Sequence, residues 1–148
     1  MIVNSFILAV SVGLFLYWFR YTCVLMLSAR TTKDFGAEVA AANRLGYVEF
    51  DGRIGTMTSS ELEAVHRSLQ RDYRLVSALL RQAGEWKVGG NSLEDMMLRA
   101  DFQLMKLAYG VSRRVSDARA RSAVKEMTQI VAHMANAFGE QASSSARA

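Results

Sequence analysis

A glutamate and a histidine three residues apart, Glu63 and His66, are the pair in this chain most suited to holding a metal ion. On a helix this spacing puts both side chains on one face, as in di-metal carboxylate sites. Such a site needs a second pair and further inward carboxylates. The other histidine, His133, has Gln129 and not a carboxylate four residues before it. We therefore interpret Glu63 as part of a helix start and keep a metal-dependent enzyme only as the remotest alternative.

The rest of the chain carries none of the common catalytic motifs. It has no glycine-rich phosphate loop, no cysteine pair for zinc or haem and no serine in a nucleophile elbow. The single cysteine, Cys23, cannot form an internal disulfide, which agrees with a reducing compartment. We therefore expect a protein that is not an enzyme and that uses no cofactor or metal.

Arginine contributes most of the basic charge in a chain whose formal charge is +4. Residues 99–125 alone hold seven basic side chains against two acidic ones. A solvated outer helix face is the ordinary interpretation, and a surface for anionic lipid or nucleic acid is the alternative. The candidate anion-binding residues are Arg67, Arg71, Arg74, Arg81, Arg113, Arg114 and Arg121. No nucleic-acid recognition motif accompanies them, so we do not expect nucleic acid as the partner.

The N-terminal segment is a long apolar run that precedes the rest of the chain. No charged side chain occurs from Ile2 to Phe19, and about 18 helical residues rise about 27 Å, enough to cross the hydrocarbon core of a bilayer. The sequence predicts a transmembrane helix from Ser5 to Trp18, within an anchor and interfacial extension that covers residues 1–27. A cleaved signal peptide is the alternative, but neither a basic start nor a small-residue end flanks the apolar run.

Aromatic rings and a cation indicate where the span ends. Rings with a polar tip and a snorkelling cation suit the headgroup region. Basic side chains that follow the span, Arg30 and Lys33 among them, have no counterpart before it. The positive-inside rule therefore predicts an external N-terminus and a cytoplasmic C-terminal domain. The expected membrane-interface residues are Tyr17, Trp18, Arg20 and Tyr21.

Small side chains recur at every fourth position of the expected span. They are Ser5, Ala9 and Gly13, and this spacing lets two membrane helices approach closely. We expect this face to pack against another span.

A juxtamembrane segment, residues 28–58, is expected between the anchor and the domain. Its first part, residues 32–45, has helical periodicity, and Gly46 is a plausible stop. Residues 46–58 contain a turn-forming cluster, so we predict a loop with a short extended piece at Tyr47 to Phe50.

Residues 59–138 predict an all-α domain, a three-helix bundle behind the single membrane helix. The first helix starts with Ser60 and Glu63 in a capping-box pattern, and the linker before Ser92 contains Gly89 and Gly90. A third helix begins near Ser116, and residues 139–148 predict a disordered tail. The apolar stripe of the first helix comprises Leu62, Val65, Leu69, Tyr73, Val76 and Leu80.

The second helix of this domain carries two apolar stripes. The Leu93 stripe, expected in the core, consists of Leu93, Met97, Ala100, Leu104, Leu107 and Val111. The Phe102 stripe consists of Leu98, Phe102, Met105 and Tyr109. Because one neighbour cannot cover both stripes, we expect this helix to be central, with the Phe102 stripe as a partner surface.

The predicted function follows from this architecture. We expect a single-span membrane protein whose cytoplasmic helical domain binds a protein partner or a second copy, as a scaffold or accessory subunit. The alternative is a membrane-tethered binder of anionic lipid or nucleic acid through its arginine-rich helix faces.

Overall fold

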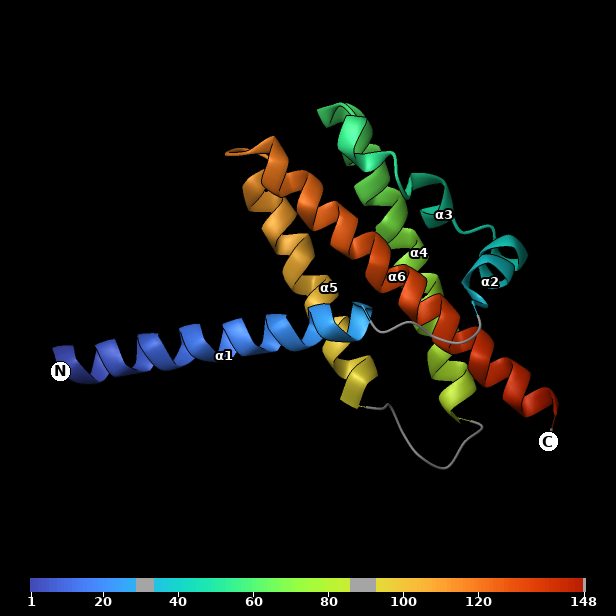
Figure 1. Cartoon of the computed structure of the whole chain (residues 1–148), viewed down its shortest axis with the longest axis horizontal. Helices are drawn as coiled ribbons and strands as arrows, with labels where there is room; N and C mark the ends of the chain where they lie inside the picture. The colour runs from blue at the N-terminus through green and yellow to red at the C-terminus, as the bar shows by residue number, and fades with distance from the viewer. Residues whose placement is uncertain (29–33, 86–92, 148) are drawn as a thin grey trace. The chain divides into compact units, whose positions relative to one another are not determined.

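The computed structural model describes residues 1–28, 34–85 and 93–147, and all the regular structure in these ranges is helical. The chain divides into two compact units, Met1–Arg30 and Thr31–Ala148 (Figure 1). Arg30, Lys33, Gly89, Gly90 and Ser92, on which several expectations rest, lie outside the described residues.

The first unit is built on one long helix, α1, which spans Ile2–Ser28. The absence of proline and the run of apolar residues favour uninterrupted backbone hydrogen bonding. Its most apolar 18-residue window has a mean hydropathy of 2.0, so α1 is long and apolar enough to cross a membrane. The helix continues past the predicted end at Trp18, and the Thr22 hydroxyl donates to the Trp18 carbonyl oxygen at 2.9 Å.

The second unit contains five α-helices and one short 3₁₀-helix in its described residues. They are α2 (Gly36–Asn43), α3 (Tyr47–Phe50), η1 (Ile54–Thr56), α4 (Ser59–Glu85), α5 (Leu93–Ser112) and α6 (Asp117–Ala146).

The central helix of this unit is α6. Figure 1 shows α6 running between α4 and α5, and α2, α3 and η1 also contact it. Its buried side chains occur at short intervals along most of its length: Ala120, Ala123, Val124, Met127, Thr128, Ile130, Val131, Met134, Ala135 and Asn136. Helix α5 packs mainly on α6. The expectation that the second long helix is central is therefore wrong, because alanines and valines make α6 slim enough to be surrounded.

Helix α4 begins with a capping box two residues before the predicted one. The Glu61 carboxylate accepts the Thr58 backbone N–H at 2.7 Å, and the Glu61 N–H reaches the Thr58 hydroxyl at 3.4 Å. The Thr58 hydroxyl also donates to this carboxylate at 2.7 Å, and the two bonds that the carboxylate accepts lower the pKa of Glu61. The apolar stripe of α4 is confirmed, since each of its six residues is buried or half-buried.

The segment predicted as a loop with an extended piece is instead helical and belongs to the second unit. The buried Asp72 of α4 accepts the backbone N–H groups of Gly46 at 2.7 Å and Tyr47 at 3.1 Å. This carboxylate satisfies the start of α3, so Tyr47–Phe50 forms a helical turn. The Tyr47 hydroxyl donates to the Gly36 carbonyl oxygen at 2.8 Å, and burial first, then Asp34 and Asp72, raise its pKa to about 12.

The start of α2 is attached to α6. The Phe35 N–H donates to the Asn136 side-chain oxygen at 2.6 Å. Gly139 allows the close approach, because a Cβ there would overlap the Phe35 side chain and meet Val39 at 3.1 Å.

The predicted helix end at Gly139 and the disordered tail are therefore wrong: Gly139 is buried inside α6, and the helix continues to Ala146. The domain boundary predicted between residues 58 and 59 is also wrong, because α2 and α3 pack within the second unit.

Candidate functional site

Aromatic stacking fixes which side of α5 faces the core. The Phe102 ring lies parallel to the Tyr73 ring of α4, with centroids 3.9 Å apart. The Tyr109 ring stacks on His66, with centroids 4.1 Å apart. All four members of the Phe102 stripe (Leu98, Phe102, Met105 and Tyr109) are buried, with exposed fractions between 1% and 7%. The prediction of a partner surface at this stripe is therefore wrong.

The Leu93 stripe, expected in the core, lies on the opposite side of α5. Leu93, Leu107 and Val111 are 70%, 68% and 69% exposed. Ala100 is exposed, and Met97 and Leu104 are half-buried. Met96 beside the stripe is 59% exposed, and Val115 just after the helix is 75% exposed. A row of large apolar side chains in water is typical of a surface that binds another molecule.

The charged side chains of α5 point away from the Leu93 stripe. The Glu94 carboxylate contacts His133 of α6 at 2.9 Å. Arg99 pairs with Asp95 at 2.9 Å and donates to the Ser77 carbonyl oxygen of α4 at 3.5 Å. Asp101 is fully buried, and Lys106 is close enough to His66 to lower its pKa. The outer side of α5 is left apolar and uncharged.

Glu63 and His66 serve interhelical packing. Glu63 forms an ion pair with Arg113 at 3.6 Å. Burial first, then Lys106 and Arg113, lower the pKa of His66, and a neutral ring suits stacking on Tyr109. Among the described residues, no three histidine, cysteine or carboxylate side chains gather as they would around a metal ion.

The seven candidate anion-binding arginines do not share one function in the structure. Arg71 pairs with Asp72 at 3.3 Å, Arg113 pairs with Glu63, and Arg121 donates to the Met57 carbonyl oxygen at 3.2 Å. The other four are exposed: Arg67, Arg74, Arg81 and Arg114. Arg71 is the member of this set that lines the open pocket beside α3.

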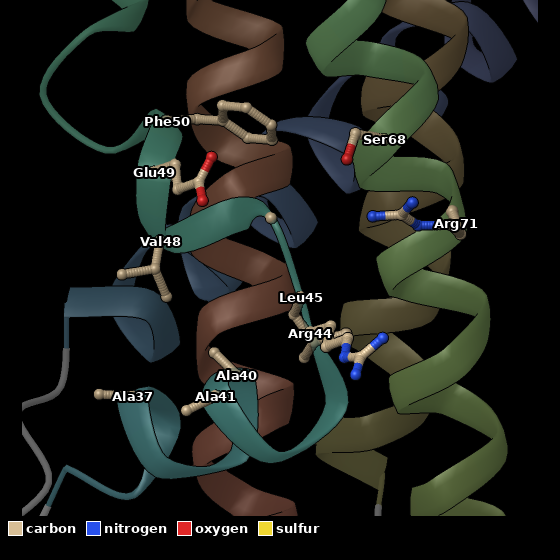
Figure 2. A pocket seen from close by; sticks show the side chains of 11 residues that line it. Ala37, Ala40, Ala41, Arg44, Leu45, Val48, Glu49, Phe50, Ser68 and Arg71 are labelled. Atoms are coloured by element: carbon tan, nitrogen blue, oxygen red, sulfur yellow. The ribbon is translucent and has the colours of Figure 1, made fainter.

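This pocket, of about 500 Å³, lies between α2, α3 and α4. Arg44 and Arg71 extend into it from α2 and α4, and the Glu49 carboxylate lies on the other side, near Phe50 (Figure 2). Arg44 closes α2 in the left-handed conformation, with φ of 52°, which is uncommon for a residue with a side chain. Arg44 was not among the predicted residues, although a basic residue two positions before Gly46 at a helix end is a usable signal.

The residues predicted to work in a membrane are all on α1. Tyr17, Trp18 and Tyr21 are exposed and form consecutive edge-to-face ring pairs, while Arg20 is half-buried. The proposed packing face is open on this helix: Ser5, Ala9 and Gly13 are exposed, and a Cβ on Gly13 would meet nothing within 4 Å. Their roles at an interface or between spans stay predictions.

Comparison with known proteins gives no indication of function, so a proposal must rest on the surfaces described above. No protein-family model, curated protein or solved structure matches the chain.

Proposed function

We propose that this protein is anchored in a membrane by α1 and binds another protein through the Leu93 stripe of α5, as a scaffold or accessory subunit. The N-terminus lies outside and the Thr31–Ala148 unit lies in the cytoplasm. The proposal includes no enzymatic activity, because the sequence carries none of the common catalytic motifs.

The exposed Leu93 stripe is the observation that carries this proposal. Three of its side chains are more than two-thirds exposed, and burying a leucine or valine contributes about 1.5–3 kcal/mol. A partner that covers the stripe would therefore gain several such contributions at once. The absence of charge on this side of α5 avoids the desolvation penalty that a buried ion would add.

The membrane part rests on the length of α1 and on the side at which its cations lie. Arg20 and the basic residues after it follow the apolar run, and this asymmetry supports a cytoplasmic C-terminal unit. The test uses Ser144→Cys in a Cys23→Ala background. The new thiol should resist an impermeant reagent in intact cells and react after permeabilisation. Labelling in intact cells, or a mature N-terminus after residue 29, would contradict the topology.

Photo-crosslinking in native membranes tests the binding function. A photoreactive residue at Leu107 should give a discrete crosslinked band, because the partner covers this position. Leu75 of α4 is the matched control, since it is also an exposed leucine, at 37%, but lies outside the stripe. Equal crosslinking at both positions, or none at Leu107, would refute binding through α5.

A second candidate function is the binding of an anionic lipid headgroup in the pocket beside α3. The observation that favours it is the pair of guanidinium groups, Arg44 and Arg71, together with the Ser68 hydroxyl in one open pocket. Guanidinium groups match phosphate oxygens in geometry and charge. Arg44→Ala should then lower retention of residues 31–148 on phosphatidylserine vesicles at low salt, whereas Arg81→Ala, another exposed arginine on α4, should change it little.

A further inference from the structure

We propose that the partner of the Leu93 stripe is the same stripe of a second copy of this chain, with the two α5 helices antiparallel. This inference rests on the proposed function and names its partner.

The spacing of the stripe selects an α-helix as the partner. Its members follow one another at intervals of four, three, four, three and four residues, which is the seam of a helical coiled coil over two and a half heptads. Side chains at this spacing insert into the gaps between those of a facing helix. This chain itself supplies a helix with a matching row.

Charge makes the stripe compatible with its own copy. Each chain carries a formal charge of +4, so two copies repel wherever their cations meet. The contacts of Glu94 with His133 and of Arg99 with Asp95 and Ser77 hold charged groups away from the stripe. Two copies can therefore approach at the Leu93 stripe without bringing charges of the same sign together.

Side-chain size selects the antiparallel arrangement. In antiparallel pairing centred between Ala100 and Leu104, Leu93 faces Val111, Met97 faces Leu107, and the small Ala100 faces Leu104. Each layer then contains at least one large side chain, which favours close packing. In parallel pairing, two alanines would meet in one layer and leave a void.

The flank of the stripe agrees with a two-fold axis at this point. Gln103 is exposed beside the centre of the seam, and an axis through the centre brings it opposite its own copy. A side-chain amide carries both a donor and an acceptor, so two glutamines can bond each other. The interface is isologous and closed, and anchors in one membrane would raise the local concentration of copies.

Disulfide trapping of the full-length chain in its membrane tests the inference. All variants carry Cys23→Ala, which removes the single native thiol. In isolated membranes treated with a mild oxidant, co-expressed Leu93→Cys and Val111→Cys chains should form a mixed disulfide. Leu93→Cys alone should not crosslink to itself, because antiparallel pairing separates the two positions by about 27 Å. A Leu75→Cys chain controls for random collision and should give no dimer.

Self-association gives the second readout. Leu107→Glu should weaken it about tenfold or more, and Val111→Glu should act in the same direction, while circular dichroism confirms that both variants remain helical. Self-crosslinking of Leu93→Cys would overturn the antiparallel arrangement. No crosslink between copies, with the Leu107 photo-crosslinker trapping a different protein, would overturn the inference and leave the proposed function standing. No crosslink of either kind would refute both.

Discussion

At the scale of single residues, the buried Asp72 carboxylate decides the path of the chain before α4. It accepts hydrogen bonds from two backbone N–H groups at the start of α3 and forms an ion pair with Arg71, although only 1% of its side chain is exposed. Nothing in the sequence around Asp72 indicates that these donors come from residues about 25 positions earlier. The resulting helical turn replaces the extended piece that the alternation from Tyr47 to Phe50 predicts.

Replacing Asp72 should show how much this carboxylate stabilises the unit. Asp72→Ala leaves the Gly46 and Tyr47 N–H groups without their acceptor, and hydrogen bonds to a charged group contribute about 1.5–3 kcal/mol each. We expect the free energy of unfolding, measured with urea, to fall by about 3–6 kcal/mol. Asp51→Ala, at an exposed carboxylate on the same segment, should change it by less than about 0.5 kcal/mol.

His66 should make stability depend on pH. Its pKa in the folded protein is lowered below the ordinary 6.5 by burial, Lys106 and Arg113, so between the two pKa values the unfolded chain binds the proton and the folded chain does not. The free energy of unfolding should therefore be highest above pH 6.5 and decrease as the pH falls through 6.5 toward the lowered value. His66→Phe keeps a ring against Tyr109 but cannot titrate, so urea unfolding at several pH values should show a shallower decrease. Identical slopes for both proteins would contradict the role of His66.

At the scale of helices, the orientation of α5 is the feature that sequence patterns cannot determine. Helix α4 has one apolar stripe, and its burial was predicted correctly. Helix α5 has two stripes with the same helical spacing, so periodicity alone does not choose between them. The choice depends on rings from α4, Tyr73 and His66, which stack on Phe102 and Tyr109. These contacts between helices cannot be read from the periodicity of α5 alone.

The two stripes of α5 should respond oppositely to charge. Phe102→Glu puts an unpaired carboxylate into the core, where an uncompensated charge costs about 3–5 kcal/mol or more, and should unfold much of the unit. Leu107→Glu places the same group on a position that is 68% exposed and should leave the unfolding temperature within a few degrees of the original. Thermal unfolding followed by circular dichroism distinguishes the two. If Leu107→Glu were the more damaging change, the assignment of the inner face would be incorrect.

At the scale of the whole molecule, the second unit is larger than the sequence predicts. The pattern of long helices located α4, α5 and the start of α6 correctly: the third helix was predicted to begin near Ser116, and α6 begins at Asp117. The contributions of α2 and α3 were missed because they depend on contacts such as Phe35 with Asn136, across 101 positions. Short helices with few apolar residues give little periodicity of their own.

Truncation should reveal the true extent of this unit. Residues 31–148 should express as a soluble, cooperatively unfolding helical protein, since they contain all the helices that cover α6. Residues 59–138 lack α2 and α3 and end before Gly139, so apolar surface on α6 becomes exposed. We expect this shorter fragment to unfold at a lower temperature or to aggregate, as measured by calorimetry and light scattering. Equal stability of the two fragments would contradict the packing role of α2 and α3.

The central position of α6 also has a consequence for synthesis on the ribosome. Helices α2, α4 and α5 emerge first, yet each completes its packing on a helix that follows all of them. At about 5–20 residues per second, the roughly 100 residues between Phe35 and Asn136 take about 5–20 s to translate. During that interval the apolar stripes of the earlier helices lack α6, their main packing partner. The nascent chain is therefore expected to bind chaperones until α6 has left the ribosome. A premature stop codon within α6 should prevent the whole second unit from folding.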